Sequence, residues 1–233
     1  MDLAPEGDEI EIADAAAAFL AEAMPITRLH EPGNSDMDAA TRARLGEMGW
    51  FALAVPEDRG GSGLSPVEHA LFFRAAGRQC APVDLLAQCL AANAATDAEL
   101  RQSLIAGESG VALMVADGPA YRLIGTADAR HALLVTPQRA PLHAIAGIAA
   151  EARPSLDPAN SLRLLAKSPA LREEAEDARI WQLGQLGAAA MLVGLAEAAL
   201  EMIGEYAKVR ETFGRKIGAW QAVRHPCADM AVR

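Results

Sequence analysis

The sequence predicts a mainly α-helical protein with a small central β domain, on three observations. The 233-residue chain is 52% hydrophobic but only 4% aromatic and rich in alanine, which favours helices packed through small side chains. Between residues 110 and 169, short apolar runs alternate with turn residues, a pattern typical of strands. Residues 174–214 contain no proline and are apolar through the middle, which predicts one long helix. We therefore expect an N-terminal helical domain (1–109), a small β domain (110–172), and the apparently incomplete start of a C-terminal helical bundle (173–233).

Composition also limits the classes of function. A formal net charge of −10 argues against a surface that binds nucleic acid or anionic membranes. Cys80, Cys89 and Cys227 form no CxxC pair and no His/Cys cluster, so no metal site is expected, and Cys80 and Cys89 fall in helical patterns as small apolar residues. The acidic N-terminus lacks a basic region followed by an apolar one, so it is no secretory signal. These features predict a cytoplasmic protein.

Helical spacing and capping signals divide the first 109 residues into five helices. Ser65 is a suitable N-cap and Pro66 suits the first helical position. Pro25 is expected to end the first helix, and residues 32–35 to form a loop before the second. The predicted helices are 8–24, 36–48, 66–79, 82–95 and 96–107.

Three glycines lie close together before Ser65, at Gly60, Gly61 and Gly63. Such a stretch is either a connecting turn between helices or a loop that cradles phosphate. The phosphate reading is the weaker one, because no GxGxxG follows a strand and no GK[ST] ends the stretch. We expect a turn.

The middle of the chain contains five apolar runs of strand length. Asp117-Gly118-Pro119 is one of the turn segments that separate them. The predicted strands lie within 110–116, 121–125, 131–137, 141–149 and 161–169.

The long helix has acidic residues at its front and Gly214 at its back, where a left-handed cap would lie. Residues 186–196 are apolar on nearly every side, so the helix is expected to be buried as the centre of an antiparallel bundle; this run is too short to span a bilayer. Glu197, Glu201 and Glu205 share one face, which is expected to be a solvated stripe rather than a set of catalytic carboxylates.

Two stretches of the chain resemble the acyl-CoA dehydrogenase family. One is Tyr206, then Arg210-x-x-Phe213-Gly214, Gln221 seven residues later, and an Ala-Asp-Met helix at 228–230. The other is LGEMGWFALAVPEDRGGSGLSPVEHALFFRAAGR at 45–78, which is similar to the family's N-terminal helical domain. The spacing of both makes the resemblance specific.

The resemblance implies FAD-dependent α,β-dehydrogenation of an acyl-CoA thioester, a reaction of lipid metabolism, by an oligomeric flavoprotein. It implies that Arg210, Thr212, Phe213 and Gln221 bind the FAD of a partner subunit, with the arginine on the pyrophosphate. Three of them also have an ordinary alternative. Arg210 could be a cation at a helix end, Phe213 a core aromatic ring, and Gln221 a surface amide.

The chain lacks the family motifs that bind the flavin ring, and it has no identified catalytic base. The Thr-Glu-Pro-x-x-Gly-Ser-Asp and Trp-x-Thr/Ser-Asn motifs are missing, because Val115-Ala116 runs straight into DGPAYRLIG. The catalytic base is unidentified: the usual Glu lies in a region beyond Arg233, and the other position that the family uses corresponds to Gly184, beside Gln185. The acidic residues before the long helix, which are Glu174, Glu176 and Asp177, lie more than a turn away from that position.

These departures predict a supporting subunit of a heteromeric acyl-CoA dehydrogenase, which contributes FAD contacts to a catalytic partner. Two alternatives stay open: a competent homo-oligomer whose base lies beyond residue 233, and a non-enzymatic protein that serves only in assembly. Whether Pro226 kinks or starts the final helix also stays open.

Overall fold

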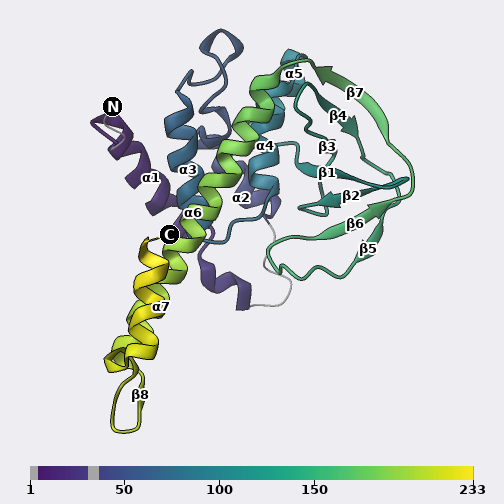
Figure 1. Ribbon diagram of the computed structural model, residues 1–233. Coiled ribbons are helices and arrows are strands. Elements are labelled where there is room, and N and C mark those ends of the chain that lie inside the picture. Colours follow the sequence, from purple (N-terminus) through teal and green to yellow (C-terminus); the bar gives the residue numbers. More distant parts are fainter. Residues whose placement is uncertain (1–4, 31–36, 233) are drawn as a thin grey trace.

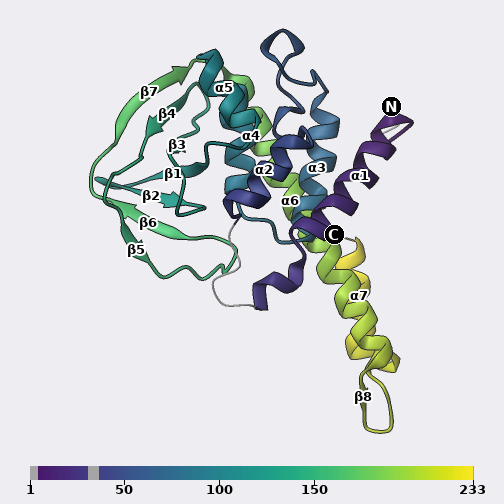
Figure 2. The ribbon, with the colours of Figure 1, turned by 180° about the vertical axis from the view of Figure 1, so that it is seen from behind.

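The computed structural model describes residues 5–30 and 37–232, and they form a group of helices beside one β-sheet (Figure 1). Helix α6 runs along the boundary between the two, and a hairpin of α6 and α7 projects away from both (Figure 2). The predicted loop at 32–35 and the predicted start of the second helix at Asp36 lie outside the described residues.

The N-terminal helices match the prediction to within a few residues. Ser65 accepts a hydrogen bond from the amide of Val67, and Pro66 is the first residue of its helix, as expected. Asp38 and Asp97 cap two further helices through their carboxylates. The helices are α1 (Asp8–Ala23), α2 (Ala39–Glu47), α3 (Pro66–Arg78), α4 (Asp84–Ala94) and α5 (Ala98–Ile105), with 3-10 turns at Ile26–His30, Trp50–Ala52 and Glu57–Arg59.

The glycine loop is a connecting turn. The amides of Ser62, Gly63 and Leu64 donate to main-chain oxygens of residues 52, 55 and 53. Because these amides are already bonded within the loop, they are not directed at a ligand, and the phosphate-cradle alternative is excluded.

The sheet has seven strands in the order β5-β6-β2-β1-β3-β4-β7. Only β1 and β3 pair in parallel; the other neighbours are antiparallel. The edge strands carry charge: Glu151 and Arg153 in β5, and Arg172 to Glu174 in β7. The strands are β1 (Val111–Asp117), β2 (Ala120–Ile124), β3 (His131–Leu133), β4 (Ala140–Ala144), β5 (Glu151–Arg153), β6 (Leu162–Leu165) and β7 (Ala170–Ala175).

All five predicted runs contain a strand, but β5 and β7 were not predicted. Strand β7 includes Glu174, which the sequence had suggested as the front of the long helix. Helix α6 instead spans Ala178–Val209 and begins where the Asp177 carboxylate accepts from the amide of Arg179. The prediction failed because a charged edge strand has no apolar alternation to reveal it.

The C-terminal end of α6 also differs from the prediction. Gly214 is left-handed, but it lies in the turn of a small hairpin between β8 (Glu211–Thr212) and β9 (Arg215–Lys216), and Arg210 caps the helix. A 3-10 turn at Ile217–Ala219 leads into α7 (Gln221–Val232). Pro226 lies inside α7 and does not start it.

The prediction that α6 is buried on all sides is wrong. Its buried residues, among them Leu183, Gly187 and Gly194, face α3 and α4, whereas Leu192 is 67% and Val193 51% exposed. The whole of α6 is long and apolar enough to cross a membrane, although its uninterrupted apolar run is too short. Only 11% of its most apolar 18-residue stretch is buried.

The acidic face of α6 is largely exposed to solvent, as expected, and its carboxylates form ion pairs. Glu197 binds Arg74 and Arg78 of α3, and Glu201 binds Arg78. Gly194 makes this close approach possible, because a Cβ there would meet the main-chain oxygen of Arg74. These surface ion pairs link α3 to α6.

Cys89 lies in a helix as predicted, whereas Cys80 does not. Cys89 is buried in α4, where burial raises the pKa of its thiol, as expected of a small apolar residue. Cys80 was expected in a helix but lies in the turn after α3 with a φ of 48°.

Candidate functional site

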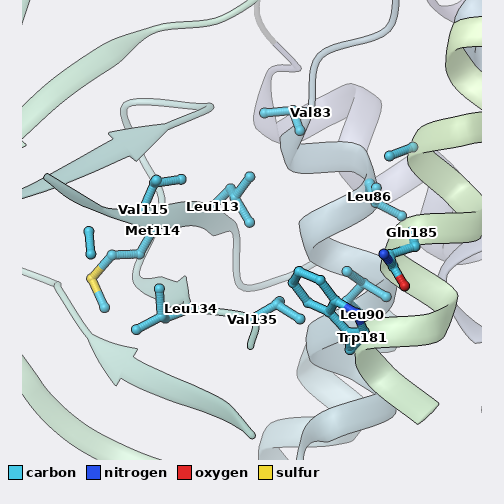
Figure 3. A pocket seen from close by; sticks show the side chains of 13 residues that line it. Val83, Leu86, Leu90, Leu113, Met114, Val115, Leu134, Val135, Trp181 and Gln185 are labelled. Carbon is cyan, nitrogen blue, oxygen red and sulfur yellow. The ribbon is translucent and has the colours of Figure 1, made fainter. Parts of the chain in front are cut away.

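An apolar pocket of about 490 Å³ lies where the sheet, α4 and α6 meet. Strand β1 provides one wall with Leu113 and Met114, together with Val135 from the segment after β3, and α6 provides the other with Trp181 and Gln185 (Figure 3). The full lining is Val83, Leu86, Leu90, Leu113, Met114, Val115, Ala116, Leu134, Val135, Trp181, Gly184, Gln185 and Ala188.

The pocket contains the position at which the family resemblance would put a base. Gly184 and Gln185 both line it, and no carboxylate is among its lining residues in the described part of the chain. A general base needs a titratable group within hydrogen-bond reach of its proton. The pocket therefore has no group of its own that could remove a proton.

The acidic residues before α6 have structural roles. Glu174 and Glu176 lie near Arg139, with nitrogen–oxygen distances of 3.6 Å and 3.8 Å, and Asp177 caps α6. None of them lines the pocket.

The turn between β1 and β2 leaves no room for a flavin-binding loop. Asp117 pairs with Ala120, so only Gly118 and Pro119 connect the strands. A flavin ring requires hydrogen-bond donors near its polar edge, and the pocket offers side-chain donors only from Trp181 and Gln185. Among the described residues, the side chains of this pocket therefore offer a flavin ring few hydrogen-bond partners.

The four residues that the sequence analysis assigned to a partner's FAD lie together at the far end of α6. Arg210 ends the helix, Thr212 is in β8, Phe213 is at the hairpin tip, and Gln221 begins α7. Arg210, Phe213 and Gln221 are exposed and Thr212 is half-buried.

Phe213 is not a core residue. Its side chain is 93% exposed, and its φ is 51°, in the left-handed region that aromatic residues avoid. With Gly214 at 78°, both central residues of the two-residue turn have positive φ, as type I′ hairpins require. Such a turn normally prefers Asn-Gly, so the chain keeps an exposed ring at a strained position.

Neighbouring aromatic and basic groups support the tip. The Phe213 ring meets the edge of Trp220 with centroids 6.2 Å apart, and the Arg215 guanidinium carbon lies 3.4 Å from the Trp220 centroid. Among the described residues, the Arg210 side chain has no hydrogen bond or ion pair. Arg210 and Phe213 thus expose a cation and an aromatic ring within three residues of each other.

The tip lies far from the chain's own pocket. Twenty-five residues of continuous helix separate Gln185 from Arg210, which is roughly 37 Å at 1.5 Å per residue. The pocket and the tip therefore cannot act on one small molecule within a single chain.

Comparison with known proteins gives the family. The model for the N-terminal domain of acyl-CoA dehydrogenases matches residues 6–103, and that for the C-terminal domain matches 181–233. The chain belongs to the acyl-CoA dehydrogenase family. FAD-dependent dehydrogenation is the general activity of this family. The resemblance drawn from residues 45–78 and 206–230 is thus confirmed.

Individual relatives agree with this assignment. Acyl-CoA dehydrogenase FadE34 of Mycobacterium tuberculosis is 32% identical over 219 residues, which cover 87% of this chain and 31% of that protein. The M. tuberculosis ChsE4–ChsE5 complex matches with a TM-score of 0.73 and 22% identity over all of this chain and 75% of its own. The FAD complex of PigA matches with a TM-score of 0.75 and 17% identity, over 100% and 76% of the two chains. These two structures show the shared fold.

The chain spans about a third of the length of FadE34 and at most 60% of the M. tuberculosis relatives IpdE2 and FadE27. The activity of a whole acyl-CoA dehydrogenase is therefore a proposal for this chain.

Trp181 was not found by sequence reasoning, although its ring is a main part of the pocket wall (Figure 3). One signal was available: Trp181, Gln185 and Ala188 are spaced by four and three residues, which places them on one helix face.

Proposed function

We propose that this chain is a supporting subunit of an FAD-dependent acyl-CoA dehydrogenase. In this proposal, Arg210, Thr212, Phe213 and Gln221 bind an FAD held by a catalytic partner subunit. The observation that carries it is the contrast between the two ends of α6: a pocket with no carboxylate at one end, and an exposed Phe213 beside Arg210 at the other. We also propose that the chain has three domains, at residues 1–109, 110–172 and 173–233.

The chemistry of each residue supports its proposed role. The Arg210 guanidinium would pair with phosphate oxygens, which accept its planar array of donors. The Phe213 ring would cover an aromatic surface, and the Thr212 hydroxyl and Gln221 amide would donate to polar atoms of the dinucleotide. FAD, when bound, supplies the hydride acceptor, and the acyl-CoA would be the substrate of the partner.

Other features are consistent with this role. A complex of two different proteins, ChsE4 and ChsE5, shares the fold. The net charge of −10 supports a protein that binds neither nucleic acid nor anionic membrane, and we propose a cytoplasmic location.

Flavin content is the direct test. The protein would be purified alone and together with a full-length acyl-CoA dehydrogenase from the same organism, and visible absorbance and complex mass would be measured. We expect flavin only in the complex, and we expect Arg210→Ala to reduce the flavin per complex at least tenfold without changing its mass. Lys208→Ala is the control, because it removes a positive charge from the same end of α6, where Lys208 pairs with Glu205, and it should leave the flavin unchanged.

Each other outcome contradicts the proposal. Flavin bound by this protein alone would indicate a competent homo-oligomer with a base outside these 233 residues. A complex without flavin, or one whose flavin is unaffected by Arg210→Ala, would leave a role in assembly only.

A further inference from the structure

The hairpin of β8 and β9, at the tip of the α6–α7 projection in Figure 1, has two faces of different charge. Its register pairs Glu211 with Lys216 and Thr212 with Arg215. Successive residues of a strand point to opposite faces, and paired residues point to the same one, so Thr212 and Arg215 share a face. Glu211 and Lys216 share the other face, where they form an ion pair at 2.7 Å.

Arg210 belongs to the same face as Arg215. Its backbone is extended, with φ −69° and ψ 131°, and its main-chain oxygen accepts from the amide of Ile217 at 2.8 Å, which continues the register. Because Arg210 precedes Thr212 by two residues, the two side chains lie on one face. Arg210 and Arg215 are therefore diagonal neighbours, and the Cβ atoms of such a pair are roughly 7–8 Å apart.

Trp220 holds the Arg215 guanidinium in place. The central guanidinium carbon lies 3.4 Å from the centroid of the indole ring. An arginine that stacks on an aromatic ring keeps its N–H donors in the guanidinium plane, where they are available for hydrogen bonds. Among the described residues, the Arg215 side chain makes no hydrogen bond or ion pair. The stacking thus orients the guanidinium without using its donors.

The acidic side chains nearest to this face in the sequence are paired with lysines. Glu205 pairs with Lys208, and Glu211 pairs with Lys216. Although the chain has a net charge of −10, the two arginines of this face have no carboxylate partner among the described residues. The face is therefore suited to a ligand with two negative charges close together.

We infer that Arg215 binds phosphate together with Arg210, as a second cation of the proposed FAD contact. Both phosphates of FAD are negatively charged, and a planar guanidinium pairs with phosphate oxygens through two donors at once. The Thr212 hydroxyl, on the same face, would donate to the same group. This inference rests on the proposed function and adds Arg215 to the four residues that the sequence assigned to it.

A carboxylate of the partner protein is the other group that could pair with Arg215. Two observations favour phosphate. The face carries two arginines rather than one, and the turn that joins their strands carries Phe213, whose ring is 93% exposed and can stack on a flat ring system. A dinucleotide combines both features in one ligand.

The test uses the complex with a full-length acyl-CoA dehydrogenase, freed of flavin and titrated with FAD. Flavin fluorescence gives the Kd, and light scattering gives the mass of the complex. We expect Arg215→Ala to raise the Kd at least about tenfold without changing the mass. Arg215→Lys should raise it less, because lysine keeps the charge but lacks the planar array of donors.

Lys216→Ala is the matched control. Lys216 is the next residue and carries the same charge, but it lies on the opposite face and pairs with Glu211. Its removal should change the Kd of FAD by less than about threefold. Circular dichroism would establish that the variants are folded, and Arg215→Gln replaces Arg215→Ala if the alanine variant is not.

Salt dependence separates phosphate binding from a purely structural role. Salt screens interactions between exposed charges, so each phosphate contact makes the Kd rise more steeply with salt concentration. Arg215→Ala should therefore show a shallower rise than the wild type between about 0.05 M and about 0.5 M salt. A variant that only loosens the hairpin would keep the wild-type slope.

Three results would overturn the inference. They are equal effects of Arg215→Ala and Lys216→Ala, weaker binding of FAD with the wild-type salt slope, and a loss of complex mass with unchanged flavin in the complex that remains. The last result would mean that Arg215 pairs with a carboxylate of the partner. An effect of Arg210→Ala without one of Arg215→Ala rejects this inference alone, whereas a wild-type complex that binds no FAD rejects the proposed function as well.

Discussion

The His69 imidazole Nε2 lies 3.1 Å from the main-chain oxygen of Leu183, across the contact between α3 and α6. Because a carbonyl oxygen only accepts, His69 donates through Nε2 and is the Nε2–H tautomer when neutral. Burial, opposed by this hydrogen bond and reinforced by the charge of Arg179, lowers the pKa of His69 to about 4. The pairing of the two helices thus contains one neutral histidine.

This histidine makes stability depend on pH. The folded-state pKa of about 4 is below the ordinary value of 6.5, so protonation favours the unfolded chain. The stabilisation is complete above pH 6.5 and is lost as the pH falls toward 4, with a total of roughly 3 kcal/mol. Chemical denaturation at a series of pH values measures it.

His69→Gln is the control, since its amide can donate to Leu183 without titrating. The variant should lose most of the pH dependence between 6.5 and 4. A wild-type slope retained in full would mean that other groups cause the acid sensitivity.

Gly194 and Gly204 differ in what surrounds them. A Cβ at Gly194 would lie 1.9 Å from the main-chain oxygen of Arg74, whereas a Cβ at Gly204 meets nothing within 4 Å. We expect Gly194→Ala to destabilise the protein by about 1–3 kcal/mol and Gly204→Ala to stabilise it by about 0.5–1 kcal/mol. Thermal unfolding of both variants gives the comparison, and a neutral Gly194→Ala would contradict the close approach of α3 and α6.

The buried Arg42 joins the helices to the sheet region. Its guanidinium donates to both carboxylate oxygens of Asp128, at 3.2 Å and 2.8 Å, and to the main-chain oxygen of Gly107 at 3.0 Å. Burial raises the pKa of Asp128, but hydrogen bonds from Arg42 and Thr126 outweigh it and hold the pKa below its ordinary value. The stabilisation of the folded state by the Arg42–Asp128 pair is therefore present above about pH 4 and is lost in acid.

We expect Asp128→Asn to cost about 1–2 kcal/mol, since Asp128 is half-exposed and solvent screens part of the interaction. Asp117→Asn, which breaks the exposed pair with Arg122, should cost less than about 1 kcal/mol. Urea unfolding at neutral pH would distinguish them; equal losses would show that the burial of Arg42 has no effect.

Phe213→Asn separates stability from function. Asparagine tolerates positive φ, so the variant should gain about 1 kcal/mol in free energy of unfolding. The same variant should reduce flavin retention in the complex with a catalytic partner. Phe19→Leu serves as a control for loss of an aromatic ring, because Phe19 packs on Trp50 and is distant from the hairpin in sequence. If Phe213→Asn kept all of the flavin, the ring would have no part in binding it.

Helix ends were predictable because their signals are local. Ser65 and Pro66 act within one turn of the chain, and the structure places both as the sequence suggests. The absence of a long loop after β1 was equally predictable from the sequence, because a two-residue turn is formed by adjacent residues.

Other features depend on contacts that one segment does not reveal. Strand β7 is recognised by its pairing with β4, not by its own charged sequence. The apolar middle of α6 suggested burial on all sides, but an apolar residue is buried only where another element meets it, and α3 and α4 cover one face. The pocket at Trp181 likewise required the approach of β1 and the segment after β3 to α6.

The charged edges of the sheet restrict how these molecules can assemble. Glu151 and Arg153 on β5, and Arg172 to Glu174 on β7, make hydrogen bonding to a strand of another molecule unfavourable at both ends. Cross-molecule sheet extension, a common route to aggregation, is thus discouraged even though the protein exposes apolar side chains elsewhere. Contacts with other molecules are therefore expected to involve helices or loops rather than added strands.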